Sequence, residues 1–222
     1  MNQPPDEIRQ HILASLQDVD PNRLKLLRLE LSSEESVALA AEALAEELPR
    51  DAHSYIDTAF FAGGVLHPER RPADLRADDV LESFKINVIA HLFLIKHFSR
   101  FLPPRRRKAQ TPLWVHVSAR VGSISDNRLG GWYSYRASKA ALNQVIRTFD
   151  RHLVASKIPA MCVGVHPGTV MTDLSRPFWG SVHESALFKP EYAAERLAAV
   201  VKNLEVEQRG RVWDWAGKEV PP

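Results

Sequence analysis

The sequence contains a single cysteine, Cys162, among its 222 residues, and it contains no glycine before Gly63. One cysteine cannot form an internal disulfide bond, which excludes the small folds that disulfides hold together. Cys162 lies in an apolar run, and this predicts a buried structural thiol. The chain also lacks an apolar run long enough to span a bilayer, and its first residues do not resemble a secretory signal. We therefore expect no membrane contact and a cytoplasmic location.

Neither sign of charge dominates, because 29 Lys and Arg face 27 Asp and Glu, for a formal net charge of +2. Such a balance gives no strong field for nucleic acid, and we expect no nucleic-acid partner. The basic run Arg105–Lys108 follows two prolines and is best interpreted as a solvated surface loop, with phosphate binding as the alternative. The nine histidines show no spacing typical of metal ligands, so the sequence predicts no metal site.

Periodic apolar patterns predict helices and strands that alternate along one domain, residues 1–222. The expected helices cover residues 6–17, 32–48, 77–101, 132–155 and 191–204. The expected strands cover residues 24–31, 55–61, 113–118, 161–166 and 211–213. This order predicts an α/β fold, with a doubly wound, mostly parallel sheet covered by helices on both faces.

Sheets of this kind bind ligands beyond the carboxyl ends of their strands. Three expected strands end in Ala62-Gly63, in Ser118 and in Pro167-Gly168. These residues therefore predict a site at one edge of the sheet.

Tyr135 and Lys139 are four residues apart in an expected helix, so they share one helix face. A lysine cation beside a phenol favours the phenolate and would lower the pKa of Tyr135. Tyr135 could then exchange a proton with a carbonyl or an alcohol near neutral pH. A surface tyrosine and lysine at ordinary helical spacing are the alternative.

Further motifs accompany this pair. They are Tyr135-Arg136-Ala137-Ser138-Lys139-Ala140-Ala141-Leu142-Asn143, Asn87-Val88 and Pro167-Gly168-Thr169-Val170-Met171-Thr172-Asp173. On these residues the chain resembles the short-chain dehydrogenase/reductase family. Residues 118–124, 126–135 and 213–221 look closer still to its C-factor branch. The resemblance covers roughly residues 22–222, whereas residues 1–21 are atypical.

The resemblance implies a Rossmann-like fold and hydride transfer between NADP or NAD and a small carbonyl or alcohol substrate. Tyr135 would be the acid/base, and Lys139 would hold the nicotinamide ribose. Asn87 would support a water molecule in a proton relay near Lys139. Family members commonly associate through the two long helices, so a homodimer or tetramer is expected.

The resemblance also implies a set of residues that contact the cofactor. They are Glu30, Leu31, Ala62, Gly63, Tyr135, Lys139, Pro167, Gly168, Val170 and Thr172. The Pro167-Gly168 turn would line the nicotinamide pocket, Thr172 would reach the carboxamide, and Glu30 with Leu31 would lie beside the adenine. The plainer alternatives are a local hydrogen bond for Asn87, a strand terminator for Pro167-Gly168 and a solvated carboxylate for Glu30.

The sequence departs from the family pattern at its front. Family members open with a βαβ unit whose Gly-rich turn approaches the pyrophosphate, and this chain shows no such turn. The strand expected at residues 24–31 would then pair directly with residues 55–61, or lie at a raw sheet edge, or leave the chain less stable than its relatives. Phe60-Phe61 also replaces an Asn-Asn pair whose side chains tie the central sheet together.

The serine that orients the substrate carbonyl is a further departure. It is the second serine of a pair in relatives with this longer loop, and the pair here reads Ser118-Ala119. Ser118 and Ser123 are both candidates to replace it, with Ser118 ahead. Phe178, Trp179 and Phe188 would form an apolar substrate wall or part of the core. A catalytically impaired binding or signalling protein, or a shortened gene product, remains the alternative to an active oxidoreductase.

Overall fold

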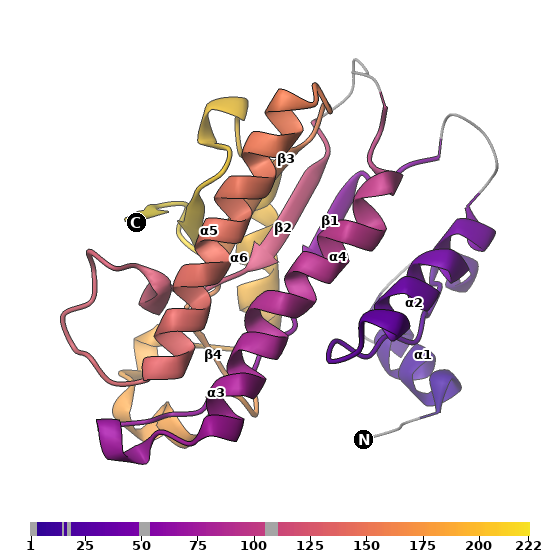
Figure 1. Cartoon of the computed structure of the whole chain (residues 1–222). Helices are drawn as coiled ribbons and strands as arrows, with labels where there is room; N and C mark the ends of the chain where they lie inside the picture. Colours follow the sequence, from indigo (N-terminus) through magenta and orange to yellow (C-terminus); the bar gives the residue numbers. More distant parts are fainter. Residues whose placement is uncertain (1–3, 15, 17–18, 49–53, 105–110) are drawn as a thin grey trace. The chain divides into compact units, whose positions relative to one another are not determined.

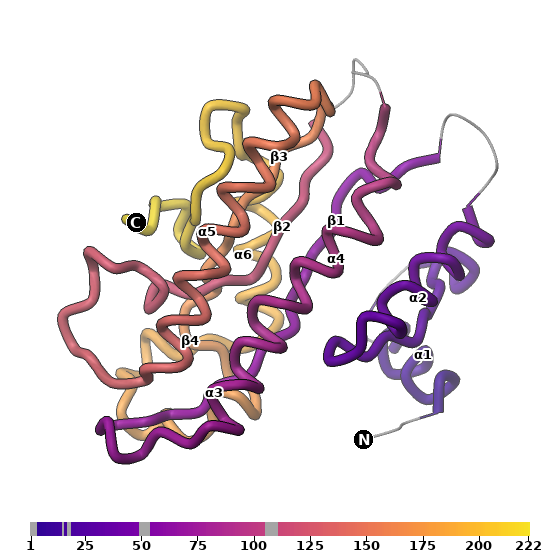
Figure 2. The backbone as a smooth tube through the Cα atoms, viewed as in Figure 1, coloured from indigo at the N-terminus to yellow at the C-terminus, as the bar shows by residue number. Residues whose placement is uncertain are grey.

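The computed structural model describes residues 4–14, 16, 19–48, 54–104 and 111–222 (Figures 1 and 2). The chain divides into two compact units, residues 1–49 and residues 50–222. The expectation of one domain over the whole chain therefore stays a prediction. The basic run Arg105–Lys108 lies outside the described residues.

The first unit contains two α-helices, α1 (Pro5–Ala14) and α2 (Glu34–Glu47), with a 3-10 turn at Pro21–Arg23 between them. The start of α2 follows from its capping residue. Ser33 Oγ accepts a hydrogen bond from the Ser36 N–H at 3.2 Å, and two glutamates occupy the first turn, where the helix dipole favours negative charge. The predicted helix is thus confirmed, and its start falls within the predicted boundary.

The strand predicted over residues 24–31 is wrong, because residues 24–30 form no regular element and a turn begins at residue 31. The apolar residues that suggested a strand are nevertheless partly shielded from solvent, since Leu24, Leu26 and Leu29 are half-buried. A strand also needs a neighbouring strand to complete its backbone hydrogen bonds, and the described part of the first unit offers none. The backbone bonds locally instead, with the Glu30 N–H donating to Ser36 Oγ at 2.9 Å.

The second unit contains a five-stranded sheet of order β1-β2-β3-β6-β7. Its strands are β1 (Thr58–Phe61), β2 (Leu113–Val117), β3 (Met161–His166), β6 (Val212–Asp214) and β7 (Glu219–Val220). The first four are parallel, and β7 runs antiparallel to β6. The mostly parallel α/β sheet is therefore confirmed, with β1 at its edge. A separate two-stranded sheet pairs β4 (Thr169–Val170) with β5 (Leu187–Phe188).

Helices cover both faces of this sheet, with α4 and α5 in front and α6 behind in Figure 1. Their bounds are α3 (Ala77–Phe84), the π-helical turn η3 (Lys85–Ile89), α4 (Ala90–Phe98), α5 (Tyr133–Ala155) and α6 (Pro190–Lys202). Short 3-10 turns occur at Pro72–Asp74, Ser99–Phe101, Arg120–Gly122, Arg176–Ser181, Glu184–Ala186 and Val206–Gln208. No helix among the described residues has the length and apolarity to cross a membrane.

Side chains of alternating strand residues separate the two faces. Val115, Val163 and Val165 form one apolar cluster with Leu197 and Val201 of α6. On the other face a side chain at Gly164 would collide with Ile146 of α5, so glycine permits the close approach of this helix. Cys162 is fully buried without a disulfide partner, which confirms the predicted structural thiol.

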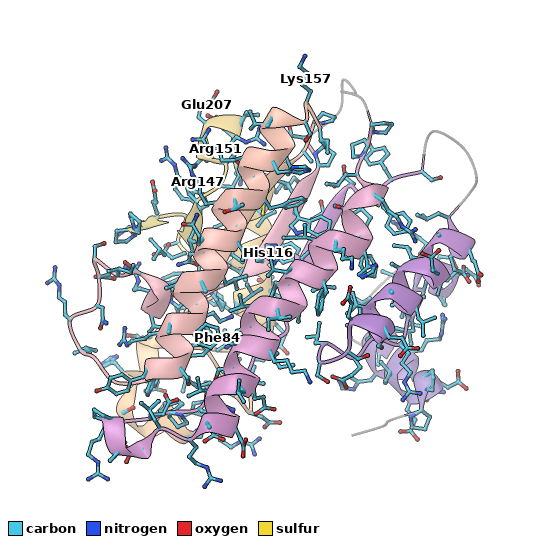
Figure 3. All side chains as sticks on the ribbon, viewed as in Figure 1. Phe84, His116, Arg147, Arg151, Lys157 and Glu207 are labelled. Atoms are coloured by element: carbon cyan, nitrogen blue, oxygen red, sulfur yellow. The ribbon has the colours of Figure 1, made fainter. Side chains whose placement is uncertain are left out.

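Aromatic packing surrounds Phe61, the second residue of the Phe60-Phe61 pair. The Phe61 ring lies 4.7 Å from Trp114 and 5.2 Å from His116 between ring centroids. His116 Nδ1 lies 2.8 Å from His91 Nδ1, and its Nε2 accepts a hydrogen bond from Trp114 Nε1 at 2.9 Å. Figure 3 shows His116 among the side chains that fill the space between sheet and helices. A ring network thus links β1, β2 and α4.

Candidate active site

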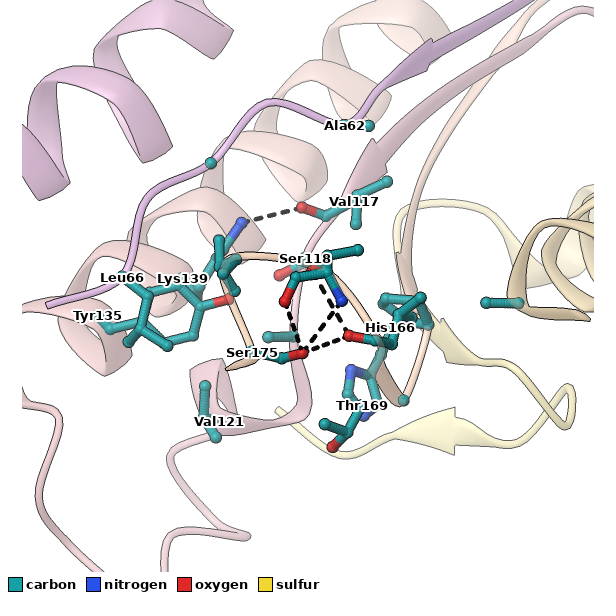
Figure 4. A pocket seen from close by; sticks show the side chains of 18 of the residues that line it. Ala62, Leu66, Val117, Ser118, Val121, Tyr135, Lys139, His166, Thr169 and Ser175 are labelled. Atoms are coloured by element: carbon teal, nitrogen blue, oxygen red, sulfur yellow. Dashed lines mark hydrogen bonds between the residues drawn. The ribbon is translucent and has the colours of Figure 1, made fainter. Parts of the chain in front are cut away.

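A cavity of about 600 Å³ opens at the carboxyl ends of β1, β2 and β3 (Figure 4). Residues from three strand ends and from α5 line it together. They include Ala62, Gly64, Ser118, Ala119, Tyr135, Lys139, His166, Pro167, Gly168, Val170 and Thr172. A volume of this size is typical of small-molecule sites. The structure therefore brings the predicted strand-end residues to one pocket.

Tyr135 and Lys139 are both buried on α5, and 8% and 3% of their surfaces are exposed. Lys139 Nζ lies 5.7 Å from the centroid of the Tyr135 ring. The ammonium donates one hydrogen bond, to the Val117 carbonyl oxygen at 3.0 Å. The other N–H groups of the ammonium have no hydrogen-bond partner among the described residues, and Lys139 lines the cavity. A ligand hydroxyl can use them.

The expectation that Lys139 lowers the pKa of Tyr135 is wrong in this structure. Burial raises the pKa of Tyr135 to about 12, because a phenolate is poorly solvated there. Burial also lowers the pKa of Lys139 to about 8. Desolvation therefore outweighs the attraction between the two groups. Tyr135 is therefore protonated at neutral pH and can donate its proton to an acceptor in the cavity.

Asn87 is buried in the π-helical turn η3. Its Oδ1 accepts a hydrogen bond from the Val65 N–H at 2.9 Å, and its Nδ2 donates to the Val65 carbonyl at 2.9 Å. The same Nδ2 donates to Ser138 Oγ at 3.0 Å. These bonds join the loop after β1 to α5. The alternative expected from the sequence, a local hydrogen bond within the helix, does not describe these long-range bonds.

Two glycines permit this close assembly. A Cβ at Gly64 would lie 3.3 Å from Asn87 Oδ1 and 3.5 Å from Lys139 Nζ, so it would fill the space beside the ammonium. A Cβ at Gly122 would lie 2.7 Å from the Lys139 backbone and cannot be accommodated without movement. Gly64 lines the cavity, whereas the predicted Gly63 is not among its lining residues.

Trp132 packs against Tyr135 from the N-terminal end of α5. It adopts a left-handed backbone conformation with φ 51° and ψ 49°, which bulky residues rarely adopt. Its ring lies edge-on to Tyr135, with centroids 6.1 Å apart, and 4.7 Å from the Phe178 ring. The backbone N–H of Trp132 donates a hydrogen bond to the Glu69 backbone carbonyl at 2.6 Å. Trp132 thus links Tyr135 to the segment at Arg176–Ser181.

Both candidate serines use their hydroxyl groups elsewhere. Ser118 Oγ donates to Asn143 Oδ1 at 2.5 Å, although Ser118 lines the cavity. Ser123 is buried, and its Oγ donates to the Pro222 carbonyl at 3.2 Å. Ala119 lines the cavity and has no hydroxyl group. Ser118 stays a prediction as the orienting serine, and it would first have to leave Asn143.

The remaining predicted residues fall into two groups. Phe178 lines the cavity; Trp179 instead donates to Ser175 Oγ, and Phe188 packs against Trp215 with centroids 4.7 Å apart. Glu30 and Leu31 belong to the first unit, so their place beside an adenine stays a prediction.

Among the described residues, no group of three or more His, Cys, Asp or Glu is arranged to hold a metal ion.

Gly64, Trp132 and His166 line the same cavity without having been predicted as site residues. Gly64 had a signal in the sequence, because it directly follows the predicted Ala62-Gly63. His166 likewise precedes Pro167-Gly168. Trp132 had no such signal, since its contribution depends on a left-handed turn.

Comparisons with known proteins agree with this geometry. A family model described as short chain dehydrogenase matches residues 4–181. The 1-hydroxy-2-glutathionyl-2-methyl-3-butene dehydrogenase of Rhodococcus sp. (strain AD45) is 34% identical over 183 residues, 82% of this chain and 74% of that protein. The C-signal protein of Myxococcus xanthus is 34% identical over 148 residues, 67% of this chain and 81% of that protein.

A solved structure shares the fold over the whole chain. It is a carbonyl reductase from chicken fatty liver with NADPH bound, with a TM-score of 0.81 and 24% sequence identity. The match covers 100% of this chain and 84% of that one.

Proposed function

The chain belongs to the short-chain dehydrogenase family of NAD(P)-dependent oxidoreductases, and on that premise we propose that it reduces an apolar carbonyl compound with NADPH or NADH. The observation that carries the proposal is the place of Tyr135 on the cavity, with Lys139 Nζ 5.7 Å from the centroid of its ring and the Trp132 ring 6.1 Å away. Reduction of a carbonyl consumes one proton, and Tyr135 holds one at neutral pH.

The residues present fit the nicotinamide end of such a cofactor. Gly64 leaves space beside Lys139 that a Cβ would fill, and the two remaining N–H groups of Lys139 suit ribose hydroxyls. Pro167 and Gly168 form the wall against which the nicotinamide would lie, with Thr172 nearby. When bound, the reduced nicotinamide supplies the hydride.

The chain's own groups supply orientation and the proton. Tyr135 donates its O–H proton to the oxygen of the substrate carbonyl, and Lys139 holds the ribose. Asn87 keeps the loop after β1 against α5 through its bonds to Val65 and Ser138. Phe178, Val121 and Leu174 give the cavity an apolar wall that excludes water and suits a hydrophobic substrate. A cytoplasmic location and a homodimer or tetramer through the long helices belong to the same proposal.

The test is the oxidation of NADPH and NADH with an aryl aldehyde or ketone, followed by nicotinamide absorbance. We expect Tyr135→Phe to lower kcat/KM by about 10³-fold, because it removes the general acid while keeping the ring. The matched control is Tyr133→Phe, since Tyr133 is two residues away on α5 and 41% exposed. It should leave turnover unchanged. Turnover retained in Tyr135→Phe places the acid elsewhere.

A binding or signalling role without catalysis is the second candidate, and Ala119 favours it. The side chain at this place has no hydroxyl, and the neighbouring Ser118 hydroxyl is bound to Asn143. Fluorescence titration of NADPH and NADH separates the two candidates. Binding with Tyr135-dependent turnover supports the reductase, and no binding at millimolar cofactor supports the second candidate.

A further inference from the structure

Two buried histidines have no part in the proposed reaction. His91 of α4 and His116 of β2 are 1% and 0% exposed, and neither lines the cavity. A buried polar ring costs free energy to desolvate unless its nitrogens have partners. One nitrogen of the pair, His91 Nε2, has no hydrogen-bond partner of ordinary geometry in the described part of the chain. The pair therefore calls for an explanation.

The bonds at the other three nitrogens determine where the protons lie. The indole Nε1–H of Trp114 can only donate, so His116 Nε2 accepts its hydrogen bond at 2.9 Å and holds a lone pair. The proton of a neutral His116 then lies on Nδ1, which donates to His91 Nδ1 at 2.8 Å. His91 Nδ1 is thus an acceptor, and the proton of a neutral His91 lies on Nε2.

Both rings are neutral under ordinary conditions. Burial, followed by the repulsion of the Lys139 ammonium, lowers the pKa of His91 to about 4. Burial also holds the pKa of His116 well below its usual value, and His91 and Lys139 act in the same direction. The hydrogen bonds from Trp114 through His116 to His91 therefore run in one direction. They end in a donor, the Nε2–H of His91.

The backbone of Gly63 lies next to this donor. Its contact with His91 acts to raise the pKa of the imidazole, against the effect of burial. A backbone group that favours an imidazolium is an acceptor, which identifies the Gly63 carbonyl. The contact is loose, since it falls outside ordinary hydrogen-bond geometry. Buried N–H groups rarely lack an acceptor, so the Gly63 carbonyl completes the series of bonds that begins at Trp114.

The Gly63 carbonyl has a direct connection to the cavity. It shares one peptide plane with the N–H of Gly64, so a bond that holds the carbonyl also sets the direction of this N–H. Gly64 lines the cavity, and a Cβ there would lie 3.5 Å from Lys139 Nζ. The next residue of the loop, Val65, is held by both of its backbone groups through Asn87. The Gly63-Gly64 peptide is the part of the loop that Asn87 leaves free to rotate.

We propose that His91 is a positioning residue whose Nε2–H donates to the Gly63 carbonyl and fixes the Gly63-Gly64 peptide beside Lys139, where the ribose of the nicotinamide cofactor binds. His91 does not line the cavity, so it acts through this peptide and not on the reacting atoms. The inference rests on the proposed function for the identity of the ligand at Lys139.

The first test observes this peptide by nuclear magnetic resonance in the protein without cofactor. The sequence contains two Gly-Gly pairs, Gly63-Gly64 and Gly130-Gly131. Glycine labelled with ¹³C at the carbonyl and ¹⁵N at the amide therefore gives two cross-peaks when each amide is correlated with the preceding carbonyl. Gly130→Asn removes the second cross-peak and so assigns the first, because asparagine tolerates the positive φ of 64° at this position. Ring ¹⁵N shifts of labelled histidine report the two tautomers.

Two variants of His91 differ in their reach. His91→Gln places an amide near the position of Nε2, whereas His91→Asn is one methylene shorter and places its amide near the position of Nδ1. We expect His91→Asn to shift the Gly63-Gly64 cross-peak and to raise the dissociation constant of NADPH about fivefold, the size of one net hydrogen bond. The value of kcat should change little. His91→Gln should keep both the cross-peak and the affinity near those of the wild-type protein.

Leu153→Val is the control for lost stability alone. Leu153 is fully buried in the last turn of α5, at the opposite end of the helix from Tyr135. The change should lower the midpoint of urea unfolding and leave the cross-peak and the affinity unchanged. A proton on His91 Nδ1 in the wild-type protein overturns the inference, as do equal effects of the Asn and Gln variants.

The resonance data separate this inference from the proposed function, because they need no cofactor. If the wild-type protein binds no NADPH, the reductase is contradicted. In that case a Gly63-Gly64 cross-peak that moves in His91→Asn and stays in His91→Gln supports the His91 hydrogen bond, and a cross-peak that stays in both overturns it. NADPH binding that is equal in the wild-type protein and both His91 variants supports the reductase alone.

Discussion

The two sides of the cavity differ in how their polar groups are satisfied. On the side of α5 and η3, Asn87 donates hydrogen bonds to the Val65 carbonyl and to Ser138 Oγ. Lys139 donates one to the carbonyl of Val117 at the end of β2. On the side of the β2 and β3 ends, Ala119 offers no polar group and His166 has a buried nitrogen without a partner. On the first side Asn87 and Ser138 are satisfied within the protein, and Lys139 keeps N–H groups for a ligand. On the second side the Nδ1 atom of His166 has no partner among the described residues.

This difference separates catalysis from selection of the substrate. A side held by its own bonds keeps Tyr135 and Lys139 in place for any substrate, and preorganisation of this kind supports the chemical step. A side with unsatisfied groups favours ligands that satisfy them. Substitutions on the first side should therefore affect all substrates alike, and substitutions on the second should change their ranking.

The largest effect on this comparison is expected from Asn87→Ala. The change leaves both backbone groups of Val65 without their partner and removes one bond from Ser138. We expect a loss of about 3 kcal/mol in the free energy of unfolding. A shift of the loop after β1 should lower kcat/KM by about 10²-fold for an aryl aldehyde and an aryl ketone alike.

Urea unfolding and the two substrates measure these losses, and Asn143→Ala is the control. The Asn143 side chain accepts a hydrogen bond from Ser118 Oγ, so its loss should cost about 1 kcal/mol. A large change of substrate ranking in Asn87→Ala would show that the two sides of the cavity are not separate.

The second effect concerns the charge of Lys139 and its pH dependence. Burial lowers the pKa of Lys139 to about 8, so the free protein loses this cation as the pH rises above about 8. If the cation holds the ribose, the affinity for NADPH should be constant below that pH. It should then fall about tenfold per pH unit above it, roughly 30-fold by pH 9.5.

Fluorescence titrations between pH 6.5 and pH 9.5 test this expectation. Lys139→Gln supplies the control, because it should bind weakly at every pH and show no such slope. A flat profile in the wild-type protein would mean that the cofactor is held without the Lys139 charge.

The predictable parts of this molecule were those fixed by local sequence. Apolar runs and alternation placed β2 and β3 within one residue of their ends, and the spacing of Tyr135 and Lys139 placed both on one face of α5. Residues 24–31 carried the same alternation, but their strand was wrong because no neighbouring strand completes it. A β-strand forms only beside a neighbouring strand, and the residues of one segment do not show whether such a neighbour is present.

Burial and partners were the unpredictable parts of the site. The helix predicted over residues 77–101 is interrupted by the π-helical turn that carries Asn87. Residues 77–101 contain no proline or glycine, so the sequence gives no signal for this interruption. The pKa of Tyr135 moved opposite to expectation, because spacing shows the neighbouring cation and does not show desolvation. The unpartnered nitrogen of His166 is likewise visible only once Asp214, Arg120 and the cavity are in place.

The smallest expected effect comes from adding a polar group to the side of the cavity at the ends of β2 and β3. Ala119→Ser adds a hydroxyl at the cavity wall, and Ala119 has an extended backbone that accepts serine. The new hydroxyl can donate to the reacting oxygen beside Tyr135. We expect kcat/KM for an aryl ketone to rise about fivefold, the size of one net hydrogen bond. Ala119→Cys is the matched control, since a thiol has similar bulk and is a weak donor. Equal changes in both variants would assign the effect to shape, and no gain with serine would mean that the reacting oxygen lies out of reach of position 119.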